Sequence, residues 1–141
     1  MRVCGVEIKS NEAIFVLMDM DDGLVGLPDC RTVRLQLTKD NVQEQIQKFH
    51  FTLQKLMTDY KVQHIVIKER PQKGKFAGAA VGFKIETVLQ LLDNVQTHIL
   101  NGTEQKEILK RNPLAVDYAD TGLKGFQQNA FMTAYAFVMK R

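Results

Sequence analysis

The fold is decided by residues 3–18, which read VCGVEIKSNEAIFVLM. A short apolar run with one acid near its end, 3–8, and a run of bulky apolar residues, 13–18, stand on either side of a short polar stretch. Such runs, bounded by turn residues, are typical of strands. Residues 32–37 then alternate apolar and polar side chains, as expected of a strand with one solvated face. This part of the chain therefore predicts three antiparallel strands joined by turns.

Beyond these strands the apolar residues recur at intervals of three or four, which is typical of amphipathic helices. Thr38 or Asp40 can cap the first helix, and Pro71 ends the next strand because proline lacks an N–H. The predicted order continues as a helix from residue 41, strand 62–67, helix 77–92, strand 95–100, and helices 103–110 and 123–140. We therefore predict one α/β domain over residues 1–141. Its mixed five-stranded sheet has three antiparallel strands followed by parallel βα units, with helices on both faces.

The composition is that of a folded chain of ordinary polarity. Its 141 residues are 45% hydrophobic and 25% charged, which excludes a disordered or fibrous protein. Two cysteines in a chain large enough to fold without staples predict reduced thiols and a cytoplasmic location. No apolar run approaches the roughly 18 residues of a membrane span, so we expect no membrane partner. The net charge of +3 permits a polyanionic partner without requiring one.

Four carboxylates stand at positions suited to chemistry. Glu7 lies near the end of the first strand, Glu69 ends the fourth, and Asp117 and Asp120 have the i, i+3 spacing of residues on one helix side. Mg²⁺ and Mn²⁺ prefer oxygen ligands, and two such ions about 4 Å apart can drive phosphodiester hydrolysis. Solvation, ion pairing and helix capping also explain these acids one by one. As a set, they predict a catalytic Mg²⁺ or Mn²⁺ site with all four residues as ligands.

Two other patterns indicate no site. Asp19, Asp21 and Asp22 precede Gly23, but the spacing of a calcium-binding loop is absent, so we interpret this segment as a solvated turn. The three histidines and two cysteines show no spacing typical of zinc ligands.

Three motifs point to one known group of proteins. Cys4-Gly-Val-Glu7 ends a strand with a glycine, an apolar residue and an acid, and Ile65-Val-Ile-Lys-Glu-Arg70 ends a second strand with an acid. Asp117-Tyr-Ala-Asp120 is a D-x-x-D pair close to the final helix. In these motifs the chain resembles RuvC-type resolvases of the RNase H-like superfamily, and it is similar to an uncharacterised bacterial family of that superfamily. The resemblance implies an RNase H-like fold and metal-dependent cleavage of nucleic acid.

The resemblance is incomplete at the acids. Glu7 stands where these nucleases usually have Asp, and Lys68 directly precedes Glu69, whose charge it can neutralise. We prefer the alignment in which Asp117 and Asp120 complete the site. A second alignment of the final helix places amides and a hydroxyl where acids are expected, at Gln127, Gln128, Asn129 and Thr133. On that alignment the site has lost carboxylates and binds metal weakly.

A basic segment follows the fourth strand. Lys73 and Lys75 flank Gly74, so this loop can approach a phosphate backbone closely, and Phe76 can stack on a base. The predicted nucleic-acid-binding residues are Lys68, Arg70, Lys73, Lys75 and Phe76. A solvated loop with Phe76 packed in the core explains the same residues without a nucleic-acid partner.

The sequence therefore supports three hypotheses. The first is a metal-dependent nuclease or resolvase-like protein acting on structured DNA or RNA. The second is a non-catalytic RNase H-like module that binds nucleic acid or protein through an eroded site. The third is a structural or dimerisation domain in which the acids only cap and pair. A junction resolvase needs a homodimer to cut two strands symmetrically, and the sequence identifies no dimer face.

Overall fold

The sheet has the predicted mixed architecture. A computed structural model describes residues 1–71 and 79–140. Its strands are β1 (Arg2–Lys9), β2 (Glu12–Asp21), β3 (Leu24–Gly26), β4 (Arg34–Gln36), β5 (His64–Lys68) and β6 (Gln96–Leu100). They lie in the order β3-β2-β1-β5-β6, and β4 also pairs with β2. The pairs on the β2 side are antiparallel, whereas β1, β5 and β6 run parallel. The expected α/β fold class is confirmed.

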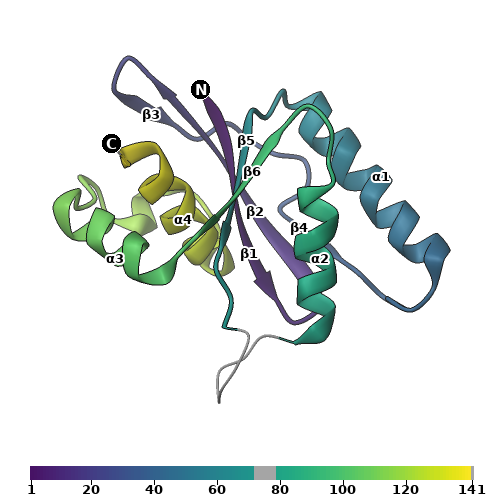
Figure 1. The fold of residues 1–141 in the computed structure, drawn as a ribbon. Helices are drawn as coiled ribbons and strands as arrows, with labels where there is room; N and C mark the ends of the chain where they lie inside the picture. The colour runs from purple at the N-terminus through teal and green to yellow at the C-terminus, as the bar shows by residue number, and fades with distance from the viewer. Residues whose placement is uncertain (72–78, 141) are drawn as a thin grey trace.

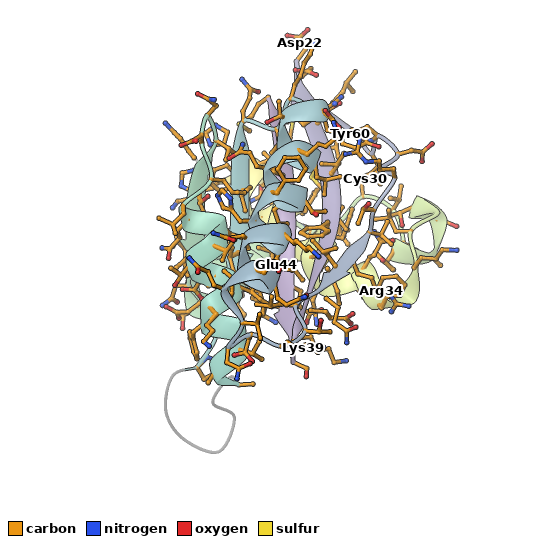
Figure 2. All side chains as sticks on the ribbon, turned by 90° about the vertical axis from the view of Figure 1, so that its right-hand side faces the viewer. Asp22, Cys30, Arg34, Lys39, Glu44 and Tyr60 are labelled. Carbon is orange, nitrogen blue, oxygen red and sulfur yellow. The ribbon has the colours of Figure 1, made fainter. Side chains whose placement is uncertain are left out.

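The sheet has six strands in the described residues rather than the five predicted, because β3 is a short strand that the sequence did not predict, and the predicted strand 32–37 is shortened to β4. Only residues 34–36 pair with β2 as β4, and β3 pairs with β2 farther along. Asp22 and Gly23, with φ angles of 51° and 80°, form the turn between β2 and β3, and Asp-Gly favours such two-residue hairpin turns. The hairpin tip at Asp22 projects beyond the rest of the sheet (Figure 2). We call β3 and β4 together the split edge strand.

Helices cover both faces of the sheet (Figure 1). The first face carries α1 (Gln43–Asp59) and α2 (Ala80–Gln90), and the second carries α3 (Gly102–Arg111) and α4 (Gln128–Met139). Two short 3₁₀ helices lie between α3 and α4: η1 (Tyr118–Thr121) and η2 (Gly125–Gln127). Each face has its own buried apolar core. None of the helices in the described ranges is long and apolar enough to cross a membrane.

The first two helices begin later than the sequence predicts. At the start of α1, Val42 is the N-cap residue and makes no side-chain cap hydrogen bond. Asp40, one of the expected caps, instead pairs with Lys84 of α2 at 2.9 Å. Of the helix predicted over 77–92, residues 80–90 form α2, while 77 and 78 lie outside the described residues.

The final helix also begins later, at Gln128 rather than near residue 123. Gly122 adopts a left-handed conformation with φ 79°, and η2 follows it before α4 starts. The start of α4 therefore lies several residues beyond Asp117 and Asp120, and neither aspartate caps this helix.

Gly5 allows α4 to lie directly against β1. A Cβ atom at this position would stand 2.2 Å from the Ala130 carbonyl oxygen and 2.7 Å from the Ala134 Cβ. Both distances are far below van der Waals contact, so only glycine fits without movement of the helix. This close approach brings the first turns of α4 to the end of β1, where Glu7 stands.

Candidate functional site

Glu7 lies on the face of β1 that α4 covers, as strand alternation from Val3 and Gly5 predicts. Its side chain is partly buried, and its Oε2 accepts a hydrogen bond from Asn129 Nδ2 at 2.7 Å. Asn129 is in the first turn of α4. The final helix thus presents an amide, not an acid, to the carboxylate of the first strand.

This contact agrees with the second alignment of the final helix. Two other residues of that alignment make hydrogen bonds to different partners. Gln127 Nε2 donates to the Phe15 carbonyl at 2.8 Å, and the Thr133 hydroxyl donates to Gln105 at 3.0 Å. Asn129 is therefore the residue of this set that contacts Glu7.

Glu69 follows the end of β5, beside β1 in the sheet. Its backbone N–H donates to the Leu100 carbonyl at 2.9 Å, which extends the β5–β6 pairing by one residue. Asn101 Nδ2 donates to Glu69 Oε1 at 3.3 Å, while Asn101 Oδ1 caps α3 by accepting from the Thr103 N–H at 2.8 Å. Asn101 thus links the predicted acid to the start of α3, a role that its position after strand 95–100 could have indicated.

Glu86 of α2 is a further acid near the end of β5 that was not among the predicted site residues. Burial raises the pKa of Glu86, and the negative charge of nearby Glu69 raises it further, while Arg70 opposes the rise. Glu69, Glu86 and Arg70 therefore share one electrostatic environment at the end of β5. The helical pattern of α2 gave no sign that Glu86 turns toward this strand end.

Asp117 and Asp120 belong to the segment around η1 and not to α4. Asp117 is the N-cap residue of η1 without a side-chain cap hydrogen bond, and Asp120 belongs to η1 itself. Both are exposed, and neither is among the residues that surround Glu7 at the surface hollow described below.

The four predicted ligands are not gathered into one metal site. Within residues 1–71 and 79–140, no group of three or more His, Cys, Asp or Glu side chains is placed to hold a metal ion. A two-metal centre needs several carboxylates that converge on shared ions. The donor set, with Asn129 hydrogen-bonded to Glu7, does not fit such a centre.

A hollow of about 410 Å³ opens beside Glu7. The end of β1 contributes Lys9, β4 contributes Arg34, η2 contributes Phe126 and the first turn of α4 contributes Asn129. The Arg34 guanidinium lies 4.5 Å from the centroid of the Phe126 ring, a cation–π contact that orients this cation at the rim. Lys9 and Arg34 are far apart in the sequence, and only the pairing of β2 with β1 and β4 brings these two basic residues to the same hollow.

The predicted nucleic-acid-binding residues have different settings. Lys68 ends β5 and is partly exposed. Arg70 folds back onto α2, with its guanidinium 4.9 Å from the Phe83 ring centroid and against the backbone of Gly82. Because Gly82 has no side chain, the Arg70 guanidinium can lie where a Cβ atom would otherwise stand. Lys73, Lys75 and Phe76 lie outside the described residues.

His64 and His98 form a pair on β5 and β6 that spacing in the sequence did not reveal. His64 Nδ1 and His98 Nε2 are 3.1 Å apart, and both rings pack against Phe137 of α4. The facing charges are Lys140, at the end of α4, and Glu104 of α3, which pairs with Lys140 at 2.7 Å. Burial, then the positive charges of His64 and Lys140, lower the pKa of His98.

This pair predicts a loss of stability in mild acid. The pKa of His98 is lower in the folded than in the unfolded protein. The stability that the neutral His98 contributes is therefore complete above about pH 6.5, and it is lost as the pH falls below this value. His98→Gln removes the titrating group, so its melting temperature should change less between about pH 7 and pH 5. Parallel melting curves of the two proteins over this range measure the difference. Equal pH dependence would contradict the prediction.

Sequence comparison identifies the family. A model described as a protein of unknown function (DUF3010) matches residues 1–137. The chain belongs to the DUF3010 family. This confirms the expected relation to an uncharacterised family, and no curated protein sequence is significantly similar to this DUF3010 chain.

Solved structures share its fold. RuvC of Thermus thermophilus superimposes with a TM-score of 0.71 at 13% identity, over 99% of this chain and 94% of that one. RuvC of T. thermophilus in complex with a Holliday junction substrate gives 0.68 at 12% identity, with the same coverage. The fowlpox virus resolvase in complex with Holliday junction DNA gives 0.58 at 13% identity, with both chains fully covered. At these identities the likeness concerns the fold alone, and it confirms the RuvC-like, RNase H-like architecture.

Proposed function

We propose that this DUF3010 protein binds structured DNA or RNA across the ends of β1 and β5 without two-metal hydrolysis. The observation that carries the proposal is the 2.7 Å hydrogen bond from Asn129 to Glu7. The Asn129 amide occupies a carboxylate oxygen of Glu7 that a divalent ion would need as a ligand. A two-metal nuclease centre also needs further acids around the ions. T. thermophilus RuvC and the fowlpox virus resolvase, which share this fold, were solved in complex with a Holliday junction. This shared fold supports nucleic acid as the partner.

The charges around these strand ends support the same partner. Lys9 and Arg34 line the hollow beside Glu7, and Lys68 ends the neighbouring strand. Because Arg34 is held against Phe126, less side-chain freedom is lost when it meets a phosphate. Phosphate contacts of this kind supply affinity that does not depend on base sequence. We therefore expect recognition of nucleic-acid shape rather than of a base sequence.

Binding that depends on these cations is the test. The double variant Lys9→Ala/Lys68→Ala should weaken binding to a four-way DNA junction about tenfold at about 0.15 M salt. It should also reduce the slope of log K against log salt by about two, since each lost phosphate contact removes about 0.9. Fluorescence anisotropy over a salt series measures both quantities.

Two exposed lysines of α3 provide the control. Lys106→Ala/Lys110→Ala removes the same charge but no residue of the hollow, so its slope should remain close to that of the unsubstituted protein. A Lys9/Lys68 variant with an unchanged slope would contradict the proposed interface, and no junction binding by the unsubstituted protein would contradict the proposed function.

A second candidate function is metal-dependent cleavage of the same nucleic acid. It is favoured by Glu7 and Glu69 standing at the ends of adjacent parallel strands. In this candidate Glu7, Glu69, Asp117 and Asp120 are the ligands of Mg²⁺ or Mn²⁺, and they must come together when the ion binds. Metal-dependent cutting of a labelled junction, lost in Glu7→Gln, would favour it over binding alone.

A further inference from the structure

The split edge strand leaves Leu17 of β2 without a hydrogen-bond partner on the outer edge of the sheet. β3 pairs with residues 19–21 of β2 and β4 with residues 12–14, and the Phe15 N–H donates to the Val33 carbonyl at 2.8 Å. Between these contacts, opposite Leu17, the chain leaves the sheet. If the β2–β3 register continued, Pro28 would face Leu17, and proline has no N–H to donate. Pro28 therefore explains why the pairing of β3 with β2 stops before Leu17.

The backbone of Leu17 points into this gap. The Met20 N–H donates to the Met1 carbonyl of the β1 side, and antiparallel pairing alternates, so the odd-numbered residues of β2 direct their N–H and C=O groups to the edge. Phe15, whose N–H reaches Val33, confirms this alternation. Among the residues that the structure describes, no hydrogen-bond partner stands on the edge side of Leu17.

A cavity of about 290 Å³ occupies the place of the absent strand residue. Its walls include Leu17, Pro28, Cys30, Thr121 and Gln127. Figure 2 shows the side of the molecule where the chain leaves the sheet, with Cys30 and Arg34 labelled along it. A cavity of this volume approaches the lower end of the range for small-molecule sites.

The wall of the cavity is held by a buried amide. Gln127 is 3% exposed. Its Nε2 donates to the Phe15 carbonyl at 2.8 Å, and its Oε1 accepts from the Lys124 N–H at 2.9 Å. The Gln127 side chain thus takes the position of a strand neighbour for Phe15, and the unpaired groups of Leu17 remain the open donor and acceptor.

We propose that this cavity binds an N-acylated amino acid derivative, a small molecule with an N–H and a C=O on either side of one tetrahedral carbon. In an antiparallel pair, one residue gives its N–H to the opposing C=O and receives the opposing N–H at its own C=O. Such a ligand therefore completes the two hydrogen bonds that Leu17 lacks, in place of the water that buried backbone groups otherwise need.

The ligand is limited to one residue by its neighbours in the sheet. β3 occupies the edge on one side of Leu17, and Val33 with β4 occupies it on the other. A longer extended peptide would meet these segments. The site is separate from the hollow beside Glu7, and the inference does not depend on the proposed nucleic-acid function.

Amide hydrogen exchange measured by NMR tests the unpaired backbone. In the free protein the Leu17 N–H should exchange at least about tenfold faster than the Phe15 N–H, which is hydrogen-bonded. Saturation with N-acetylalanine methylamide should slow exchange at Leu17 and shift its resonance. Equal, slow exchange of the two amides in the free protein would overturn the proposal.

A matched ligand tests the hydrogen-bond pattern. The ester analogue of the probe, with oxygen in place of the acetylated N–H, has nearly the same shape but cannot donate to the Leu17 carbonyl. It should bind at least about tenfold more weakly, because an unsatisfied acceptor is left in the site. Equal binding of amide and ester, or binding only by peptides of four or more residues, would overturn a one-residue ligand.

Blocking the cavity gives a second measurement. Cys30 lines the cavity and is partly exposed, whereas Cys4 is fully buried. Alkylation of Cys30 with N-ethylmaleimide should therefore abolish the probe-induced shift at Leu17 in a protein whose other resonances show an intact fold. A full shift after alkylation would place the ligand elsewhere and overturn the proposal.

Discussion

Asn129→Asp is expected to create a response to divalent metal. The substitution replaces the amide donor at Glu7 with a second carboxylate, so the contact of 2.7 Å becomes a repulsion between like charges. Without metal the variant should be less stable by about 1 kcal/mol, the size of one lost hydrogen bond at a partly exposed site. Mn²⁺ at about 10 mM should then stabilise it by about 1.4–2.7 kcal/mol for a Kd of about 0.1–1 mM.

Thermal unfolding with and without Mn²⁺ measures this response as a rise of about 4–8 °C, at about 3 °C per kcal/mol. Asn129→Ala is the control, since it loses the hydrogen bond without adding a charge and should show no metal response. A flat Asn129→Asp protein would show that this turn of α4 does not face a metal position.

The same curves separate the two candidate functions. The unsubstituted protein should respond little to Mn²⁺ if the site is eroded. A clear rise in the unsubstituted protein that Asp120→Asn abolishes would instead favour the nuclease candidate, with Asp117 and Asp120 as ligands.

Gly5→Ala is expected to be strongly destabilising. The new Cβ would stand 2.2 Å from the Ala130 carbonyl oxygen, a backbone atom that can move only with α4 as a whole. Overpacking of this kind costs about 3 kcal/mol, which corresponds to a fall in melting temperature of about 10 °C. Since α4 also carries Asn129, its displacement should weaken the contact with Glu7.

Gly125→Ala is the matched control for this prediction. A Cβ at Gly125 would meet no atom within 4 Å, so this variant should melt within about 2 °C of the unsubstituted protein, as is usual for surface substitutions. Equal melting temperatures for the Gly5 and Gly125 variants would contradict the close packing of α4 on β1.

The split edge strand was only partly predictable. Gly26 and Pro28 are residues that interrupt strands, so a break in strand pairing near them could be expected. Asp22-Gly23 favours a two-residue hairpin turn, although this segment was interpreted only as a solvated turn. Which residue of β2 would face the gap depends on the register of β2 against β1, β3 and β4 together. Register involves residues far apart in the sequence, so local patterns do not contain it.

The sequence by itself indicated the fold class, the four α-helices and all strands of the described sheet except β3. The spacing of apolar residues reflects which side chains are buried, and this spacing repeats within each helix or strand, so it can be read from neighbouring residues alone. It also determined that Glu7 would face away from Cys4 and Val6, because side chains alternate along a strand.

The site was decided only by the tertiary structure. Whether Glu7 meets Asp120 or Asn129 depends on where α4 begins and on how closely it can approach β1 at Gly5. The pairs formed by Asn101 with Glu69 and by His64 with His98 likewise join residues more than 30 positions apart. Hydrogen bonds and charge interactions act over a few ångströms in space, so their partners are known only once packing has brought the elements together.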